Sequence, residues 1–207
     1  MKTISYEKKI AWNNIKGNEY LKRAIEVSLT GQHTITVIGN PDNGKEYLDI
    51  IFKSRIDYCG EDPIFNENFF IFVQPCFCGN FGDEGCDCSA EEIISYKRIK
   101  EYINAMKSQI IIKLERPLFN EIVSVLTGES FQDVMNRIDI FNKLKTVKGT
   151  DQDAMEFLKT AYNKLLFTYS QMSKVLAVSK TIAIMDNSDR IKAHHISEAI
   201  QYQALDY

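Results

Sequence analysis

A glycine-rich loop between a strand-forming and a helix-forming segment limits the fold of this chain more than any other feature. The β-branched residues 34–38, Thr-Ile-Thr-Val-Ile, favour a strand, and residues 47–52 have the apolar spacing of a helix. Between them lie Gly39, Asn40, Pro41, Asp42, Asn43, Gly44, Lys45 and Glu46. Such a loop places backbone N–H groups and a lysine around phosphate oxygens at a helix N-terminus. We therefore expect an α/β core with a phosphate-binding loop.

The last residue of this loop departs from the motif G-x-x-x-x-G-K-[S/T]. The motif needs a hydroxyl to ligate magnesium, and Glu46 has none. Its carboxylate also places negative charge beside the phosphates that the loop would bind. Two alternatives stay open at this point: the loop holds a phosphate or nucleotide, or it persists because the turn from strand to helix needs it.

The rest of the chain predicts two more strands and a series of helices. Residues 69–73 and 109–114 are short apolar runs typical of a parallel sheet that is covered on both faces. Capping signals at Ser89, Ser130 and Thr168 each open a helix. Further helices are expected over residues 18–30, along the line of Ala154, Leu158, Ala161 and Leu165, and over residues 193–203.

Four of the five cysteines are concentrated in a Cys-rich loop over residues 74–89. They form two C-x-C pairs: Cys76, Cys78, Cys86 and Cys88. Four thiolates can enclose a zinc ion in a closed structural site, and a metal clip suits a reducing compartment better than a disulfide framework does. The spacing leaves open both a zinc site and four reduced thiols. We expect Cys59 to be an ordinary small apolar residue.

Charge and hydropathy exclude some partners. The net charge of −3 over 207 residues argues against general nucleic-acid binding, although a local basic face is compatible with it. The first residues show no signal-peptide pattern, and no apolar run reaches the length of a membrane span. We therefore expect a cytoplasmic protein with no membrane partner.

The histidines and the only tryptophan carry no catalytic pattern. No acid or nucleophile accompanies His33, His194 or His195 in a recognisable motif, so structural or capping roles are expected. Trp12 is expected to be a packing anchor. No catalytic residue is assigned.

Three stretches carry a resemblance to a known family. The first begins W-N-N-I-K-G-N-E at Trp12 and continues to the glycine loop. The second is Q-P-C-F-C-G-N-F-G-D from Gln74, followed by C-D-C-S from Cys86. The third runs from Val175 to Asp206 and contains S-D-R-I and H-I-S-E-A. Together they resemble the magnesium-chelatase subunit I-like AAA+ ATPases, specifically the bacterial branch that includes the ComM and YifB proteins.

The resemblance also shows what this chain lacks. The family holds magnesium with the loop hydroxyl and a strand-borne Asp-Glu pair, and no such strand occurs between Lys45 and Phe69. Gln74 occupies the position of the family's sensor asparagine. Lys107 is the residue nearest to the position of the family arginine that reaches a neighbouring subunit, and Ser170 falls at about the position of the sensor arginine of the lid. Phosphoryl transfer depends on positioning and charge stabilisation. We therefore expect neither magnesium binding nor efficient hydrolysis.

The resemblance implies a truncated P-loop core over residues 1–117 and a helical lid over residues 118–207. Two adjacent edge strands of the family's sheet are missing, so the strand over residues 34–38 is expected between the other two in a sheet of about three parallel strands. This places Phe69–Val73 at an apolar edge. We expect a protein partner or self-association there.

These features predict a degenerate, ComM-like AAA+ protein, a pseudo-ATPase. It would bind ATP, another nucleotide or phosphate without efficient hydrolysis and act as a binding or interaction module. One alternative is an active ATP-dependent DNA-processing motor or chelatase-type ATPase. Another is a zinc-stabilised interaction scaffold that binds no nucleotide.

Overall fold

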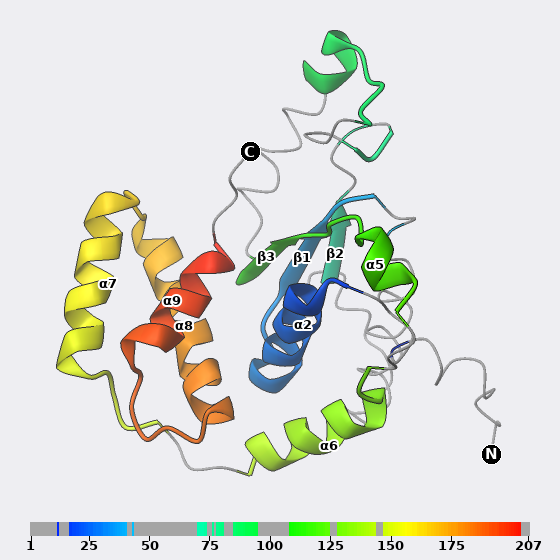
Figure 1. The fold of residues 1–207 in the computed structure, drawn as a ribbon. Helices are drawn as coiled ribbons and strands as arrows, with labels where there is room; N and C mark the ends of the chain where they lie inside the picture. The colour runs from blue at the N-terminus through cyan, green and yellow to red at the C-terminus, as the bar shows by residue number, and fades with distance from the viewer. Residues whose placement is uncertain are drawn as a thin grey trace, which may run out of the picture.

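A parallel sheet of three strands lies at the centre of the structure (Figure 1). The computed structural model describes residues 12, 17–40, 43, 70–73, 76, 78–80, 85–94, 108–124, 128–143 and 147–203. Strand β1 (Ile35–Ile38) lies between β2 (Phe70–Val73) and β3 (Ile110–Lys113). The mixed α/β class and the strand order expected from the resemblance are thereby confirmed.

The register of the sheet explains why β1 is buried throughout. Ile35 lies opposite Phe70 on one side and Ile110 on the other, and the pairing continues in parallel to Ile38. All four residues of β1 are buried. A central parallel strand has neighbours at both edges and cover on both faces, so it has no solvent side that would need polar residues.

Helix α2 (Glu19–Gly31) covers one face of the sheet (Figure 1). Its face toward the core is formed by buried residues that include Leu21, Ala24, Ile25, Ser28 and Leu29. The helix ends one residue beyond the predicted range of 18–30, and the left-handed residue that follows it is Gln32, at φ 52°. Trp12, only 4% exposed, packs edge-on against Phe131 with 5.2 Å between ring centroids, which confirms its role as a packing anchor.

The C-terminal half is helical, as the sequence predicts. Its longer helices are α6 (Phe131–Phe141), α7 (Gln152–Lys164), α8 (Tyr169–Met185) and α9 (Ala193–Gln201). The three predicted caps form: the hydroxyls of Ser89, Ser130 and Thr168 each accept a hydrogen bond from the backbone N–H three residues later. Each bond satisfies one of the N–H groups that a helix start leaves without a partner.

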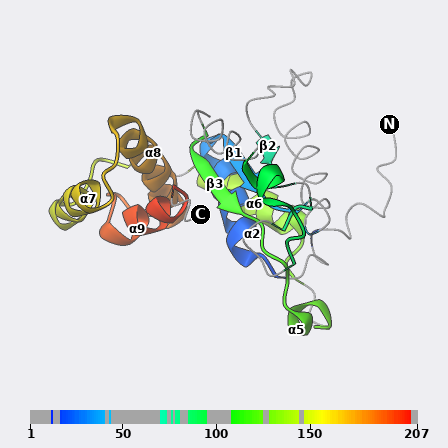
Figure 2. The ribbon, with the colours of Figure 1, turned by 90° about the horizontal axis from the view of Figure 1, so that it is seen from above.

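Two local predictions were wrong or incomplete. Leu165 was expected on the buried line of its helix, but it lies beyond the last turn of α7 and is 53% exposed. A short helix, α5 (Phe119–Ile122), was not anticipated. It stands away from the sheet (Figure 2), and Leu118, Phe119, Ile122 and Val123 are exposed around it.

The sheet and the C-terminal helices share one apolar core. Helix α2 packs against β3, α6 and α8, and α7, α8 and α9 lie together beside the sheet (Figure 2). At the outer edge of β3, the backbone N–H of Ile111 donates to the carbonyl of Tyr202 at 2.9 Å. His33 Nε2 lies 2.7 Å from Thr181 Oγ1, and both side chains are buried. His33 therefore has the structural role that was expected.

None of the helices in the described part of the chain combines the length and hydropathy that crossing a bilayer requires.

Candidate metal centre

The loop that follows β2 turns back on itself so that its cysteines meet. Gly79 has φ 81°, in the left-handed region that favours glycine, and its N–H donates to the carbonyl of Cys76 at 3.1 Å. This turn brings the sulfurs of Cys76 and Cys78 to within 3.3 Å of each other.

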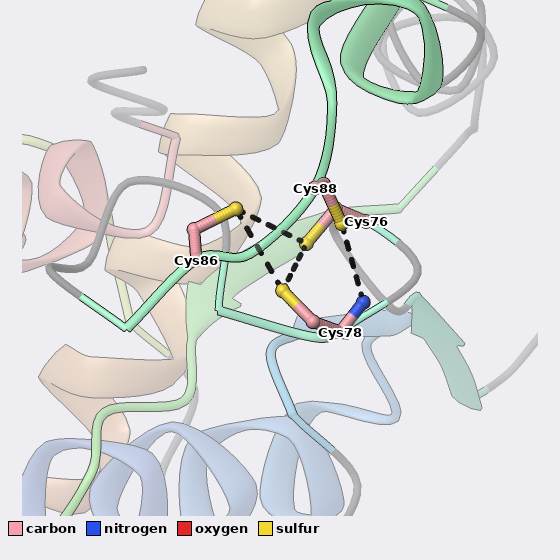
Figure 3. A group of neighbouring side chains, drawn as sticks. All are labelled: Cys76, Cys78, Cys86 and Cys88. Carbon is pink, nitrogen blue, oxygen red and sulfur yellow. Dashed lines mark hydrogen bonds between the residues drawn. The ribbon is translucent and has the colours of Figure 1, made fainter.

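The second cysteine pair closes onto the first (Figure 3). Cys86 Sγ lies 3.9 Å from Cys76 Sγ and 3.7 Å from Cys78 Sγ. Cys88 Sγ accepts a hydrogen bond from the backbone N–H of Cys78 at 3.4 Å. All four sulfurs lie within 4.8 Å of one another, and all four thiols are free.

These separations fit a single metal ion. Sulfurs bound to one tetrahedral zinc ion at about 2.3 Å lie about 3.8 Å from one another. Cys76 is fully buried and the other three cysteines are half-buried, as in a closed structural site. The four cysteines can therefore hold a metal such as zinc, with no position left for a reactive water.

The electrostatics of the cluster also favour a cation. The backbone N–H of Asn80 lowers the pKa of the Cys78 thiol to about 6, which favours the thiolate form of Cys78. Burial raises the pKa of the Cys76 thiol, because a second negative charge there would be poorly solvated. A bound divalent cation would offset half of the charge of four thiolates and favour the deprotonated form of each ligand.

In a second group of metal-ligand residue types, the one buried ring has already used its lone pair. Asp186, His194 and His195 also bring their side-chain atoms within 4.8 Å. However, His195 Nδ1 accepts a hydrogen bond from the backbone N–H of Lys192 at 2.9 Å, at the start of α9. The ring proton therefore lies on Nε2, 3.2 Å from Asp186 Oδ2, and no lone pair is available there for a metal. The expected capping role of His195 is confirmed.

The glycine loop begins where the sequence places it. Gly39 follows the last residue of β1, and a Cβ on Gly39 would lie 2.6 Å from Leu114 Cβ, so only glycine allows this approach. The N–H of Asn43 donates to the carbonyl of Asn40 at 3.0 Å. The other predicted residues of the loop lie outside the described part: Pro41, Asp42, Gly44, Lys45 and Glu46.

The glycine loop and the cysteine loop touch. Asn40 Nδ2 donates to Asn80 Oδ1 at 3.2 Å and to the carbonyl of Cys78 at 3.4 Å. Sequence reasoning did not identify Asn80. The available signal was the strand order, because loops that leave adjacent parallel strands emerge at the same edge of the sheet.

Two models of known protein families match this chain, one in its N-terminal part and one in its C-terminal part. The family model described as magnesium chelatase, subunit ChlI, matches residues 11–56. A second model, magnesium chelatase, subunit ChlI C-terminal, matches residues 134–203. The two matches span more than half of the chain, from the segment around Trp12 through the glycine loop, and from α6 to the end of α9. The chain therefore belongs to the magnesium-chelatase-like AAA+ family. No curated protein matches the sequence.

Proposed function

We propose that this chain is a shortened, catalytically degraded AAA+ protein of the ComM-like branch. It binds a nucleotide or phosphate at the glycine loop without efficient hydrolysis, and it serves as an interaction module in the cytoplasm. In this proposed organisation, residues 1–117 form a truncated P-loop core and residues 118–207 form a helical lid.

The observation that carries this proposal is the backbone geometry at Gly39. The loop leaves the carboxyl end of the central parallel strand, the position at which open α/β sheets bind ligands. Gly39 lies so close to Leu114 that no side chain fits. Together with Gly44 and Lys45 in the sequence, this supports an anion-binding loop.

The loss of hydrolysis follows from the chain's own residues. Glu46 provides no hydroxyl for magnesium, and the sequence contains no Asp-Glu dipeptide between Lys45 and Phe69. The metal that bridges the outer phosphates in working P-loop enzymes therefore lacks its protein ligands. A nucleotide held by backbone N–H groups and one lysine is bound without being activated.

Calorimetric titration with ATP, with and without magnesium, tests the proposal. We expect binding that magnesium does not strengthen, at least a tenfold loss of affinity in Lys45→Ala (about 1.4 kcal/mol), and no turnover of ATP. Lys159→Ala, an exposed lysine on α7, is the matched control and should bind as the wild type does. Magnesium-dependent hydrolysis that disappears in Lys45→Ala would instead establish the active motor or chelatase.

The sulfur geometry favours a second candidate, the zinc-stabilised scaffold that binds no nucleotide. Thermal melting of the zinc-loaded protein separates the two candidates. A ligand at 100 times its Kd stabilises the folded state by about 2.7 kcal/mol. A full zinc content together with a melting temperature that ATP does not change would support the scaffold.

The partner surface is also a proposal. Within the described part of the sheet, β2 pairs with β1 on one side only. We propose that the segment Phe69–Val73 forms the edge at which a protein or a second copy of this chain binds. A solution mass above that of the 23.8 kDa monomer would support self-association, and a strictly monomeric mass at high concentration would contradict it.

A further inference from the structure

The cysteine cluster and the glycine loop are mechanically connected through two asparagines. Asn40, the second residue of the glycine loop, donates its side-chain amide to Asn80 Oδ1 and to the carbonyl of Cys78. Both acceptors belong to the segment that carries the metal ligands. The contact joins two loops that follow adjacent strands of the sheet.

The acceptors of this contact are themselves held by the cysteine segments. Asn80 Nδ2 donates to the carbonyl of Gly85, next to Cys86, at 3.3 Å. The N–H of Cys78 donates to Cys88 Sγ at 3.4 Å. A metal ion held by the two C-x-C pairs would therefore also fix the position of the Asn80 side chain and of the Cys78 carbonyl.

The cysteine loop and the glycine loop pack so closely that the Asn40 side chain has little room to move. A Cβ on Gly79 would lie 2.9 Å from Asn40 Cγ, so the cysteine loop packs directly on the Asn40 side chain. On its other side, the carbonyl of Asn40 accepts the N–H of Asn43 and closes the first turn of the glycine loop. Asn40 therefore connects the metal-ligand segment to the first turn of the glycine loop.

Resting on the proposed function, we propose that metal binding at the four cysteines sets the phosphate affinity of the glycine loop. Asn40 and Asn80 are the positioning residues that transmit the effect. Because coupling between two binding sites is reciprocal, a phosphate ligand must raise the affinity for zinc by the same factor as zinc raises the affinity for the phosphate.

The first test measures both directions on the full chain. ATP without magnesium is titrated into the zinc-loaded and the zinc-free protein, with inorganic pyrophosphate as a second probe. We expect about a tenfold weaker affinity without zinc, within the usual range of coupling between sites. Competition with a chelator should show the same factor for zinc when ATP is present. Equal ATP affinities with and without zinc would overturn the proposal.

A variant keeps the test valid if removal of zinc unfolds the chain. Asn80→Ala removes the acceptor for Asn40 but alters neither a cysteine nor a residue of the glycine loop. It also removes the donor to the Gly85 carbonyl, so we expect a full zinc content, a slightly lower melting temperature and about a tenfold weaker ATP affinity. Asn163→Ala, an exposed asparagine on α7, is the control and should bind ATP normally. Normal ATP binding by zinc-loaded Asn80→Ala would overturn the link.

Amide exchange distinguishes failure of this link from failure of the proposed function. The N–H of Asn43 is bonded to Asn40 within the glycine loop, so its exchange reports the loop's order without any ligand. If zinc-loaded wild-type protein binds neither ATP nor pyrophosphate, the proposed function falls. Exchange at Asn43 that is faster in Asn80→Ala than in Asn163→Ala would still support the link, and equal exchange would refute it.

Discussion

Two clusters in the described part of the chain bring metal-ligand residue types equally close together, and they differ in where their lone pairs are. The four cysteine sulfurs lie within 4.8 Å of one another, and so do the ligand atoms of Asp186, His194 and His195. The sulfurs face one another at separations that suit one ion. In the second group, the only buried ring, His195, has already used its lone pair to accept the N–H of Lys192.

The difference shows that proximity alone does not make a metal site. A ligand set needs free lone pairs that converge, and a helix N-terminus consumes one when a histidine caps it. The same hydrogen bond that stabilises α9 thus removes His195 from metal chemistry.

Removal of a cysteine ligand should have the largest effect. Cys76→Ser removes the buried member of the cluster, so we expect the zinc content to fall from about one ion per chain to none. The free energy of unfolding should fall by about 4 kcal/mol or more, because metal binding contributes directly to folding. Elemental analysis and thermal melting measure both quantities.

The fifth cysteine provides the control for this experiment. Cys59→Ser changes a thiol that the sequence places outside the C-x-C pairs, and it should retain the zinc content of the wild type. If Cys76→Ser leaves both the metal content and the melting temperature unchanged, the four cysteines are reduced thiols without a metal.

Substitution of His195 should destabilise the chain without changing its metal content. His195→Ala removes a fully buried ring and the acceptor for the N–H of Lys192, so we expect a loss of about 2–3 kcal/mol in urea unfolding. His194→Ala, which changes an exposed neighbour, should stay within about 0.5 kcal/mol of the wild type. A metal ion lost from His195→Ala but retained by His194→Ala would show that the second cluster is also a site.

The pH dependence of stability should reflect the same buried ring. Burial, then the neighbouring His194, lower the pKa of His195 below 6.5, although Asp186 opposes the shift. Below pH 6.5 the unfolded chain therefore takes up a proton that the folded chain refuses, and stability falls as the pH falls. The slope from one such group reaches about 1.4 kcal/mol per pH unit.

Comparison of wild type with His195→Ala isolates this contribution. Burial also lowers the pKa of His33, so the variant should keep part of the wild-type slope below about pH 6.5. Chemical unfolding at several pH values gives the slopes. Identical slopes for both proteins would show that His195 is not buried as a neutral ring.

The smallest effect is expected for the acid in the second cluster. Asp186 is about two-fifths exposed and lies 4.0 Å from Arg23 in addition to its contacts with the two histidines. Asp186→Asn keeps the shape and removes the charge, and exposed ion pairs contribute about 1 kcal/mol or less. Urea unfolding should therefore change by no more than this, with zinc content unaffected.

Much of the fold could be predicted because its signals are local. The hydroxyl caps at Ser130 and Thr168 act within one turn of the helix they start, and the burial of β1 follows from four consecutive apolar or β-branched residues. The strand order depended on the family resemblance, since nothing within Ile35–Ile38 specifies its two neighbours. The spacing of the cysteines likewise indicated a cluster before the structure placed the sulfurs together.

The features that were missed depend on contacts between distant segments. Leu165 continues the apolar spacing of its helix, but the helix ends before it and Leu165 is 53% exposed. Asn80 acquires its role only because β1 and β2 are adjacent, which places its amide oxygen beside Asn40. Similarly, the orientation of the His195 ring is set by a backbone N–H at the start of α9.

The hydrogen bond from the Ile111 N–H to the Tyr202 carbonyl restricts how far the C-terminal helices can move relative to the sheet. The end of α9 supplies a backbone carbonyl to the free edge of β3, so the helical region continues the hydrogen bonding of the sheet. A hinge rotation of α8 and α9 away from the sheet would break this bond and the contact between His33 and Thr181 in the same step. The two halves of the chain should therefore unfold together, in a single cooperative transition, rather than rock against each other.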